Sequence, residues 1–197
     1  MQRPTAFLVA AALLPLCLAG CADGSPSPSA TAAPAAAPAI DPELAAVQAL
    51  TPIDACTWLT PERLRAVHPE LAFEVRQRLE PRMSGYAWDS RCTYWAGVGT
   101  IEFAKDTPTH TVEIFVNTPA SEAKALANMA SRRERATSTT GYQPRPELGA
   151  DAYAVTQTGM ASLFFVKQGS EVQINVSDLD SPNADKIRRA VALAQSL

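Results

Sequence analysis

Histidine is scarce in this 197-residue sequence, which contains only two, His68 and His110. Neither lies in a zinc, nucleophile or phosphate-loop motif, and neither G-x-S-x-G nor H-E-x-x-H occurs. The D-x-D segment at residues 178–180 supplies too few oxygen ligands for calcium. The sequence therefore predicts a protein that is not an enzyme and has no metal site and no cofactor.

The sequence also lacks an excess of positive charge. It has 17 Lys and Arg against 20 Asp and Glu, a net charge of −3. Removing residues 1–20 removes one basic residue, Arg3, and no acid, so the remainder carries −4. Nucleic-acid binding needs a concentrated basic surface, and attachment to anionic lipid needs a polybasic segment. Neither partner is expected.

Only one long apolar run is present, and it is too short to span a bilayer stably. It follows Arg3 and ends in Leu18-Ala19-Gly20-Cys21. A charged start, an apolar stretch and small residues before a cysteine resemble a bacterial lipobox. That resemblance implies cleavage before Cys21, lipidation of its thiol and membrane attachment through two or more acyl chains such as palmitate. An ordinary secretory signal is the competing interpretation.

The next segment is rich in Ala, Pro, Ser and Thr and cannot bury enough apolar surface to offset the entropy of ordering. We interpret it as a tether. The predicted organisation is a signal peptide (1–20), a lipidated cysteine with its tether (21–49) and a single domain (50–197).

Two further cysteines, Cys56 and Cys92, lie in the predicted domain. Export would place them in an oxidising compartment, where a pair is most simply a disulfide. A metal or redox pair is the alternative, but the C-x-x-C spacing is absent.

Hydrophobic periodicity predicts an α+β fold with an antiparallel sheet and helices packed on one face. Helices are expected after Thr60-Pro61, after Thr118-Pro119 and from residue 181. Asp89-Ser90-Arg91 is interpreted as a turn or bulge between strand segments. Two divergent half-repeats are a further hypothesis. The remaining strands are expected near residues 73–79, 101–104, 111–116, 152–157, 161–168 and 171–177.

Several short motifs occur in a specific order: Cys56-Thr57-Trp58-Leu59-Thr60-Pro61-Glu62, then Cys92-Thr93-Tyr94-Trp95, then Leu148-Gly149-Ala150-Asp151-Ala152-Tyr153. Together they resemble an uncharacterised domain of actinobacterial lipoproteins over residues 53–195. Trp58 stands where that family has leucine, and Tyr94 separates Thr93 from Trp95. The resemblance implies an α+β fold and a disulfide between Cys56 and Cys92, and it implies no activity.

Five aromatic residues form the candidate binding surface: Trp58, Tyr86, Trp88, Tyr94 and Trp95. Packing around the disulfide is the alternative explanation. A group of arginines is a candidate anion-facing rim, with solvated strand and helix faces as the alternative: Arg76, Arg78, Arg82, Arg132, Arg133 and Arg135.

The sequence thus predicts a membrane-anchored bacterial lipoprotein whose domain is a non-enzymatic binding or accessory module with an envelope or secreted protein partner. It would lie on the outer face of the cell membrane, or on the periplasmic side of the outer membrane in a diderm. The alternative is a lipoprotein immunity or inhibitor protein against a secreted toxin or hydrolase.

Overall fold

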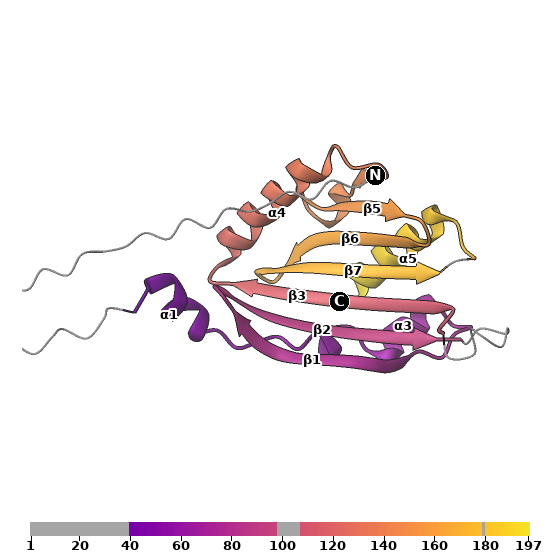
Figure 1. The fold of residues 1–197 in the computed structure, drawn as a ribbon, viewed down its shortest axis with the longest axis horizontal. Coiled ribbons are helices and arrows are strands. Elements are labelled where there is room, and N and C mark those ends of the chain that lie inside the picture. Colours follow the sequence, from indigo (N-terminus) through magenta and orange to yellow (C-terminus); the bar gives the residue numbers. More distant parts are fainter. Residues whose placement is uncertain (1–39, 98–106, 179) are drawn as a thin grey trace, which may run out of the picture. The chain divides into compact units, whose positions relative to one another are not determined.

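The computed structural model describes residues 40–97, 107–178 and 180–197, and residues 39–197 form one compact unit. Within the described residues, seven strands form a single antiparallel sheet in the order β1-β2-β3-β7-β6-β5-β4 (Figure 1). The predicted α+β fold with an antiparallel sheet is confirmed. The strands are β1 (Glu74–Ser84), β2 (Ala87–Ala96), β3 (His110–Pro119), β4 (Tyr142–Pro144), β5 (Tyr153–Gln157), β6 (Met160–Lys167) and β7 (Ser170–Asp178).

Helices precede, interrupt and follow these strands. Among the described residues no helix combines the length and the apolar character needed to cross a membrane. The strand expected at 101–104 lies outside the described residues. The helices are α1 (Pro42–Gln48), α2 (Ala55–Trp58), α3 (Pro61–Val67), α4 (Glu122–Ala136), the 3₁₀ helix η2 (Pro146–Leu148) and α5 (Asn183–Ser196).

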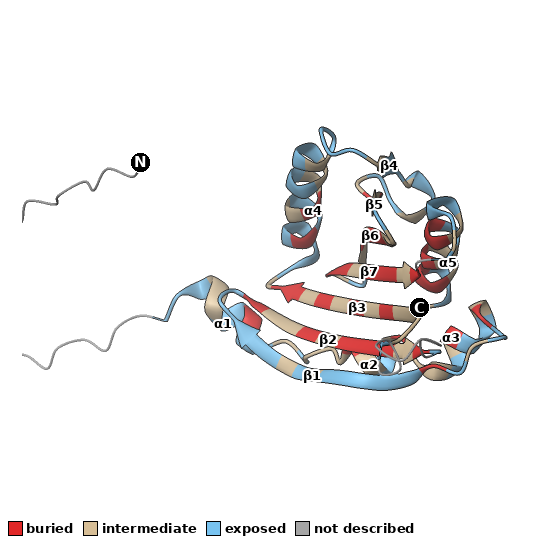
Figure 2. Ribbon diagram, turned by 45° about the vertical axis from the view of Figure 1, so that its right-hand side comes forward, coloured by how far each residue is buried: buried red, intermediate tan, exposed pale blue. Residues whose placement is uncertain are grey.

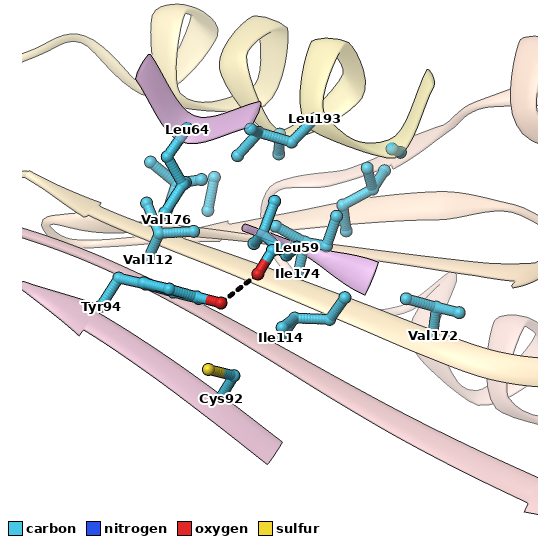
Figure 3. Close-up of a cluster of buried hydrophobic side chains, with 14 of the residues drawn as sticks. Leu59, Leu64, Cys92, Tyr94, Val112, Ile114, Val172, Ile174, Val176 and Leu193 are labelled. Carbon is cyan, nitrogen blue, oxygen red and sulfur yellow. Dashed lines mark hydrogen bonds between the residues drawn. The ribbon is translucent and has the colours of Figure 1, made fainter. Parts of the chain in front are cut away.

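The core lies on one face of the sheet, because alternate residues of each strand point to that face. Across β2, β3 and β7 the register pairs Cys92 with Ile114 and Ile114 with Ile174. Residues of α5, among them Leu193, and the α2–α3 region cover these rows (Figure 3). Tyr94 is fully buried here, and its hydroxyl donates to the carbonyl of Leu59.

The prediction that the helices lie on one face is correct for α2, α3 and α5 but not for α4. Glu171 of β7 points away from its neighbour Val172, which is in the core, and contacts Asn128 and Arg132 of α4. Helix α4 therefore lies on the opposite face from α5 (Figure 2). Three antiparallel strands precede α4 and a further four precede α5, and these helices lie on opposite faces. The half-repeats stay a hypothesis.

The folded unit begins before residue 50, where the sequence placed the start of the domain. Helix α1 begins after Asp41, whose side chain accepts from the N–H of Glu43. Val47 is fully buried, and its carbonyl accepts from the indole Nε1 of Trp88 at 2.9 Å. Residues 40–49 thus belong to the domain and not to the tether, because one apolar side chain and one long-range hydrogen bond attach them to it.

Two local predictions are corrected. Asp89-Ser90-Arg91 is not a turn but part of β2, and its pairing with β3 is regular. The register irregularity lies on the opposite strand, in β1 between Leu79 and Arg82. The Ser90 hydroxyl donates to the carbonyl of Ile53 and accepts from the N–H of Ala55. Helix α4 does not start at Thr118-Pro119, which end β3. The hydroxyl group of Thr118 is hydrogen-bonded to that of Ser170 on β7. Ser121 caps α4 instead, and its side chain accepts from the N–H of Lys124.

The predicted disulfide between Cys56 and Cys92 is present. It joins α2 to β2 across 36 residues of sequence, with the two Cα atoms 5.1 Å apart. In the chain-entropy estimate, a loop of this length contributes about 4 kcal/mol to stability. The bond holds α2 against the core face of the sheet.

Candidate functional site

The face of the sheet opposite the core carries ordered rows of polar side chains, which we call the polar face. One row runs across four strands through the paired residues Arg82, Asp89, Asn117 and Glu171. The adjacent row contains Leu79, Arg91, Phe115 and Gln173. Because opposite residues of antiparallel strands project to the same side, each row presents its side chains together.

A pocket of about 400 Å³ opens over these two rows, beside helix α4. We call it the arginine pocket, because Arg82, Arg91 and Arg132 come to it from β1, β2 and α4. Two carboxylates, Asp89 and Glu171, also line it. The amides of Asn117 and Gln173 complete its polar lining.

Arg91 is held at the pocket by two neighbours on β3. Its guanidinium lies over the ring of Phe115, 5.3 Å from the ring centre, and its Nη1 is 3.6 Å from Oε1 of Glu113. Glu113 also accepts hydrogen bonds from Thr93 and Asn175, both at 3.1 Å. The Nε of Arg91 is buried and has no hydrogen-bond partner in the described part of the chain.

Glu171 connects the sheet to α4. Its Oε1 accepts from Nδ2 of Asn128 at 2.7 Å, and its Oε2 is 3.3 Å from Nε of Arg132. The second contact is an ion pair without hydrogen-bond geometry, since Oε2 has no hydrogen-bond partner among the described residues. Glu171 is only 3% exposed, whereas the Arg132 side chain is 44% exposed at the pocket rim.

Asp89 and Arg82 are register partners on β2 and β1. Asp89 accepts a hydrogen bond from Nδ2 of Asn117 at 2.6 Å. No described carboxylate lies within ion-pair distance of Arg82, which is exposed. Asp89 is thus hydrogen-bonded to Asn117, and the guanidinium group of Arg82 makes no ion pair with a described carboxylate.

The five predicted aromatic residues do not form one surface. Alternation along β2 places Trp88 and Tyr94 on the core side and Trp95 on the polar face, where Arg76 lies over its ring. Trp58 packs against the core. Tyr86 is exposed and donates from its hydroxyl to Asp41 at 3.0 Å. The prediction of a shared aromatic binding surface is therefore not supported.

The predicted arginine rim is also divided. Arg82 and Arg132 reach the pocket, but Arg78 pairs with Asp54 and Glu80. The remaining members have other partners: Arg76 with Trp95, Arg133 with Asp151 and Arg135 with Ser131.

A second polar cluster lies at the other end of β3 and β7. His110 Nδ1 is 2.9 Å from Oγ1 of Thr109, and its Nε2 is 3.5 Å from Oδ2 of Asp178. Burial raises the pKa of Asp178, but hydrogen bonds from the Ser181 hydroxyl and backbone N–H groups outweigh it and bring the pKa to about 2. Arg189 adds an ion pair at 3.1 Å. Since Asp178 is buried and engaged by the loop after β7, we interpret this cluster as structural.

No three His, Cys, Asp or Glu side chains gather as a metal site in the residues that the structure describes. Cys21, the predicted lipidation site, lies outside them.

Some of the polar residues of the pocket can be recognised from alternation in the sequence. Glu113 and Asn117 alternate with apolar residues in β3, as Glu171 and Gln173 do in β7. Alternation predicts only that these residues lie on the face opposite the apolar one, and the sequence predicted a turn or bulge at Arg91. The missing information was the pairing of β3 with β7, which brings the two polar sets together.

No protein-family model and no curated protein matches the chain. Among solved structures, it is similar to the extracellular domain of PknH from Mycobacterium tuberculosis, with a TM-score of 0.53 and 11% identity. The match covers 74% of this chain and 96% of that one. At this identity the similarity shows that the two share a fold.

Proposed function

We propose that the chain is a membrane-anchored bacterial lipoprotein whose domain is a non-enzymatic binding module of the cell envelope. The arginine pocket is the proposed binding site. The lipobox-like sequence at Cys21 supports the anchor. The fold shared with a domain whose name describes it as extracellular is consistent with that location.

The observation that carries this proposal is the convergence of Arg82, Arg91 and Arg132 on one pocket from three separate elements. Three cations gathered in this way repel one another unless other groups or a ligand stabilise them. Arg91 and Arg132 each have a glutamate neighbour, Glu113 and Glu171. Arg82 has no described ion-pair partner, and Asp89 is engaged by an amide.

The anchor is tested by mass spectrometry of the protein from its own membranes. Wild type should carry a diacylglycerol on Cys21 and start at that residue, and Cys21→Ser should carry no lipid. An unmodified Cys21 would overturn the anchor.

The binding site is tested by photo-crosslinking in intact cells. A benzophenone amino acid in place of Leu79, at the pocket, should form an adduct that Arg91→Gln abolishes. The same amino acid in place of Arg188, on the exposed side of α5, should not form it. An adduct insensitive to Arg91→Gln, or none, would overturn the pocket as the binding site. A toxin or hydrolase in the adduct would identify an inhibitor.

A further inference from the structure

The arginine pocket presents hydrogen-bond donors that no described residue uses, beside two carboxylates that already contact protein groups. Asp89 accepts from Asn117, and Glu171 accepts from Asn128 and pairs with Arg132. Donors remain on Arg82, which has no described ion-pair partner, and on the η nitrogens of Arg91, whose Nη1 lies 3.6 Å from Glu113; the Nε of Arg91 is buried and shielded from a ligand. Because guanidinium groups present several N–H donors in a planar fork, they suit a carboxylate or phosphate group.

Arg91 is oriented before any ligand arrives. Its guanidinium lies over Phe115 and its Nη1 is 3.6 Å from Glu113, which limits its movement. Glu113 itself accepts hydrogen bonds from Thr93 and Asn175, so it does not depend on Arg91 to satisfy its oxygens. A guanidinium held in this way loses little entropy when it binds an anion.

The pocket is larger than a bare ion requires. Its volume of about 400 Å³ is at the lower end of the range of small-molecule sites, roughly 300–1,000 Å³. Such sites are usually mostly apolar, whereas this one also presents the amides of Asn117 and Gln173. Their nitrogens donate to Asp89 and Asn175, and their carbonyl oxygens remain to accept from hydroxyl groups.

We propose that the arginine pocket binds a small hydroxylated anion, a sugar or similar polyol that carries one carboxylate or phosphate group. Arg91 and Arg82 bind the anionic group, and Asn117 and Gln173 bind hydroxyl groups. Arg132 closes the rim from α4. This assignment rests on the proposed function, because it names the ligand class of the same pocket.

Isothermal titration calorimetry of the full lipidated protein tests the ligand class. A polyoxyethylene detergent is required, since sugar detergents would compete for the site. Glucuronate and glucose 6-phosphate are the probes, and glucose and inorganic phosphate are the matched controls. At least one probe should bind tenfold or more tightly than both controls, and salt should weaken it. Equal binding of glucose would overturn the role of the anion. Equal binding of phosphate would overturn the role of the hydroxyl groups.

Variants assign the residues. Arg91→Gln should weaken binding of the preferred probe at least tenfold, and Arg82→Gln should weaken it severalfold. Arg188→Gln removes one exposed positive charge from α5 and should leave binding unchanged. Circular dichroism would confirm that each variant is folded. Equal affinity in wild type and the folded Arg82→Gln and Arg91→Gln variants would overturn the assignment.

The two proposals fail separately. If no probe binds but the Leu79 adduct still depends on Arg91, the ligand class is wrong and the binding site stands. If neither the adduct nor probe binding depends on Arg91, both proposals fall.

Discussion

Asn128 of α4 donates a hydrogen bond to Glu171 of β7 over 2.7 Å, although 43 positions separate them in the sequence. With the ion pair from Arg132 to the same carboxylate, this bond attaches α4 to the polar face. The attachment matters for the arginine pocket, because α4 supplies the arginine at its rim.

Glu171→Ala should lower the free energy of unfolding by about 2 kcal/mol, because it leaves the partly buried amide of Asn128 and the rim arginine Arg132 without their acceptor. Urea denaturation measures the change. Glu134→Ala removes an exposed carboxylate from α4 and should change the free energy of unfolding by less than about 0.5 kcal/mol. Equal losses in the two variants would show that Glu171 does not stabilise the packing of α4.

A chain that begins at residue 50 should be less stable than one that begins at residue 40, by about 2–4 kcal/mol. The shorter chain loses the fully buried Val47 and the hydrogen bond from Trp88 to its carbonyl. Thermal and urea unfolding of the two purified chains would measure this difference. Identical stability would restore the boundary at residue 50 that the sequence predicted.

Tyr94→Phe should lower stability by about 1 kcal/mol at pH 7, because the carbonyl of Leu59 loses a buried donor. Burial raises the pKa of Tyr94 to about 12 in the folded protein, above the ordinary value of 10. The folded state thus retains its proton where the unfolded state loses it, and this contribution to stability declines as the pH rises from 10 through 12. The difference between wild type and Tyr94→Phe should therefore shrink over this range. A phenol that titrates near pH 10 by absorbance at 295 nm would contradict this.

Because of His68, the stability of the protein should decline as the pH falls into the mildly acidic range. Burial lowers the pKa of His68 below its ordinary value of 6.5, and the charge of Arg189 lowers it further, with His110 acting in the same direction and Glu70 opposing. The unfolded state then binds more protons than the folded state below pH 6.5, so stability declines as the pH falls from there. Unfolding between pH 4.5 and 7 should show a weaker dependence in His68→Leu.

The pH range in which His68 affects stability lies above the range in which Asp178 does. The pKa of Asp178 is about 2 in the folded protein, against an ordinary value of 3.8. Its stabilising contribution is therefore lost only as the pH falls from 3.8 towards 2. A pH dependence identical in wild type and His68→Leu between pH 4.5 and 7 would show that His68 does not cause it.

Local patterns in the sequence were sufficient for much of the fold. Thr60 and Pro61 begin α3 as predicted, because the side-chain cap and the fixed proline angle act within one helical turn. The alternation of Val172, Ile174 and Val176 predicted the strand β7, although Glu171 and Asn175 on its other face are buried as well. The cysteine pair predicted the disulfide, because export left few other uses for it.

The candidate site depended on contacts between distant segments. Alternation along β2 separates Trp95 from Tyr94 and so divides the predicted aromatic surface, as soon as one face of that strand is buried. The pairing of Asn117 with Glu171 places β3 beside β7 and completes the polar row under the pocket. That register follows from burying the apolar residues of both strands on the same side. The sequence by itself determined which residues alternate; only the tertiary structure decided which strands are neighbours, and therefore that Arg82, Arg91 and Arg132 meet.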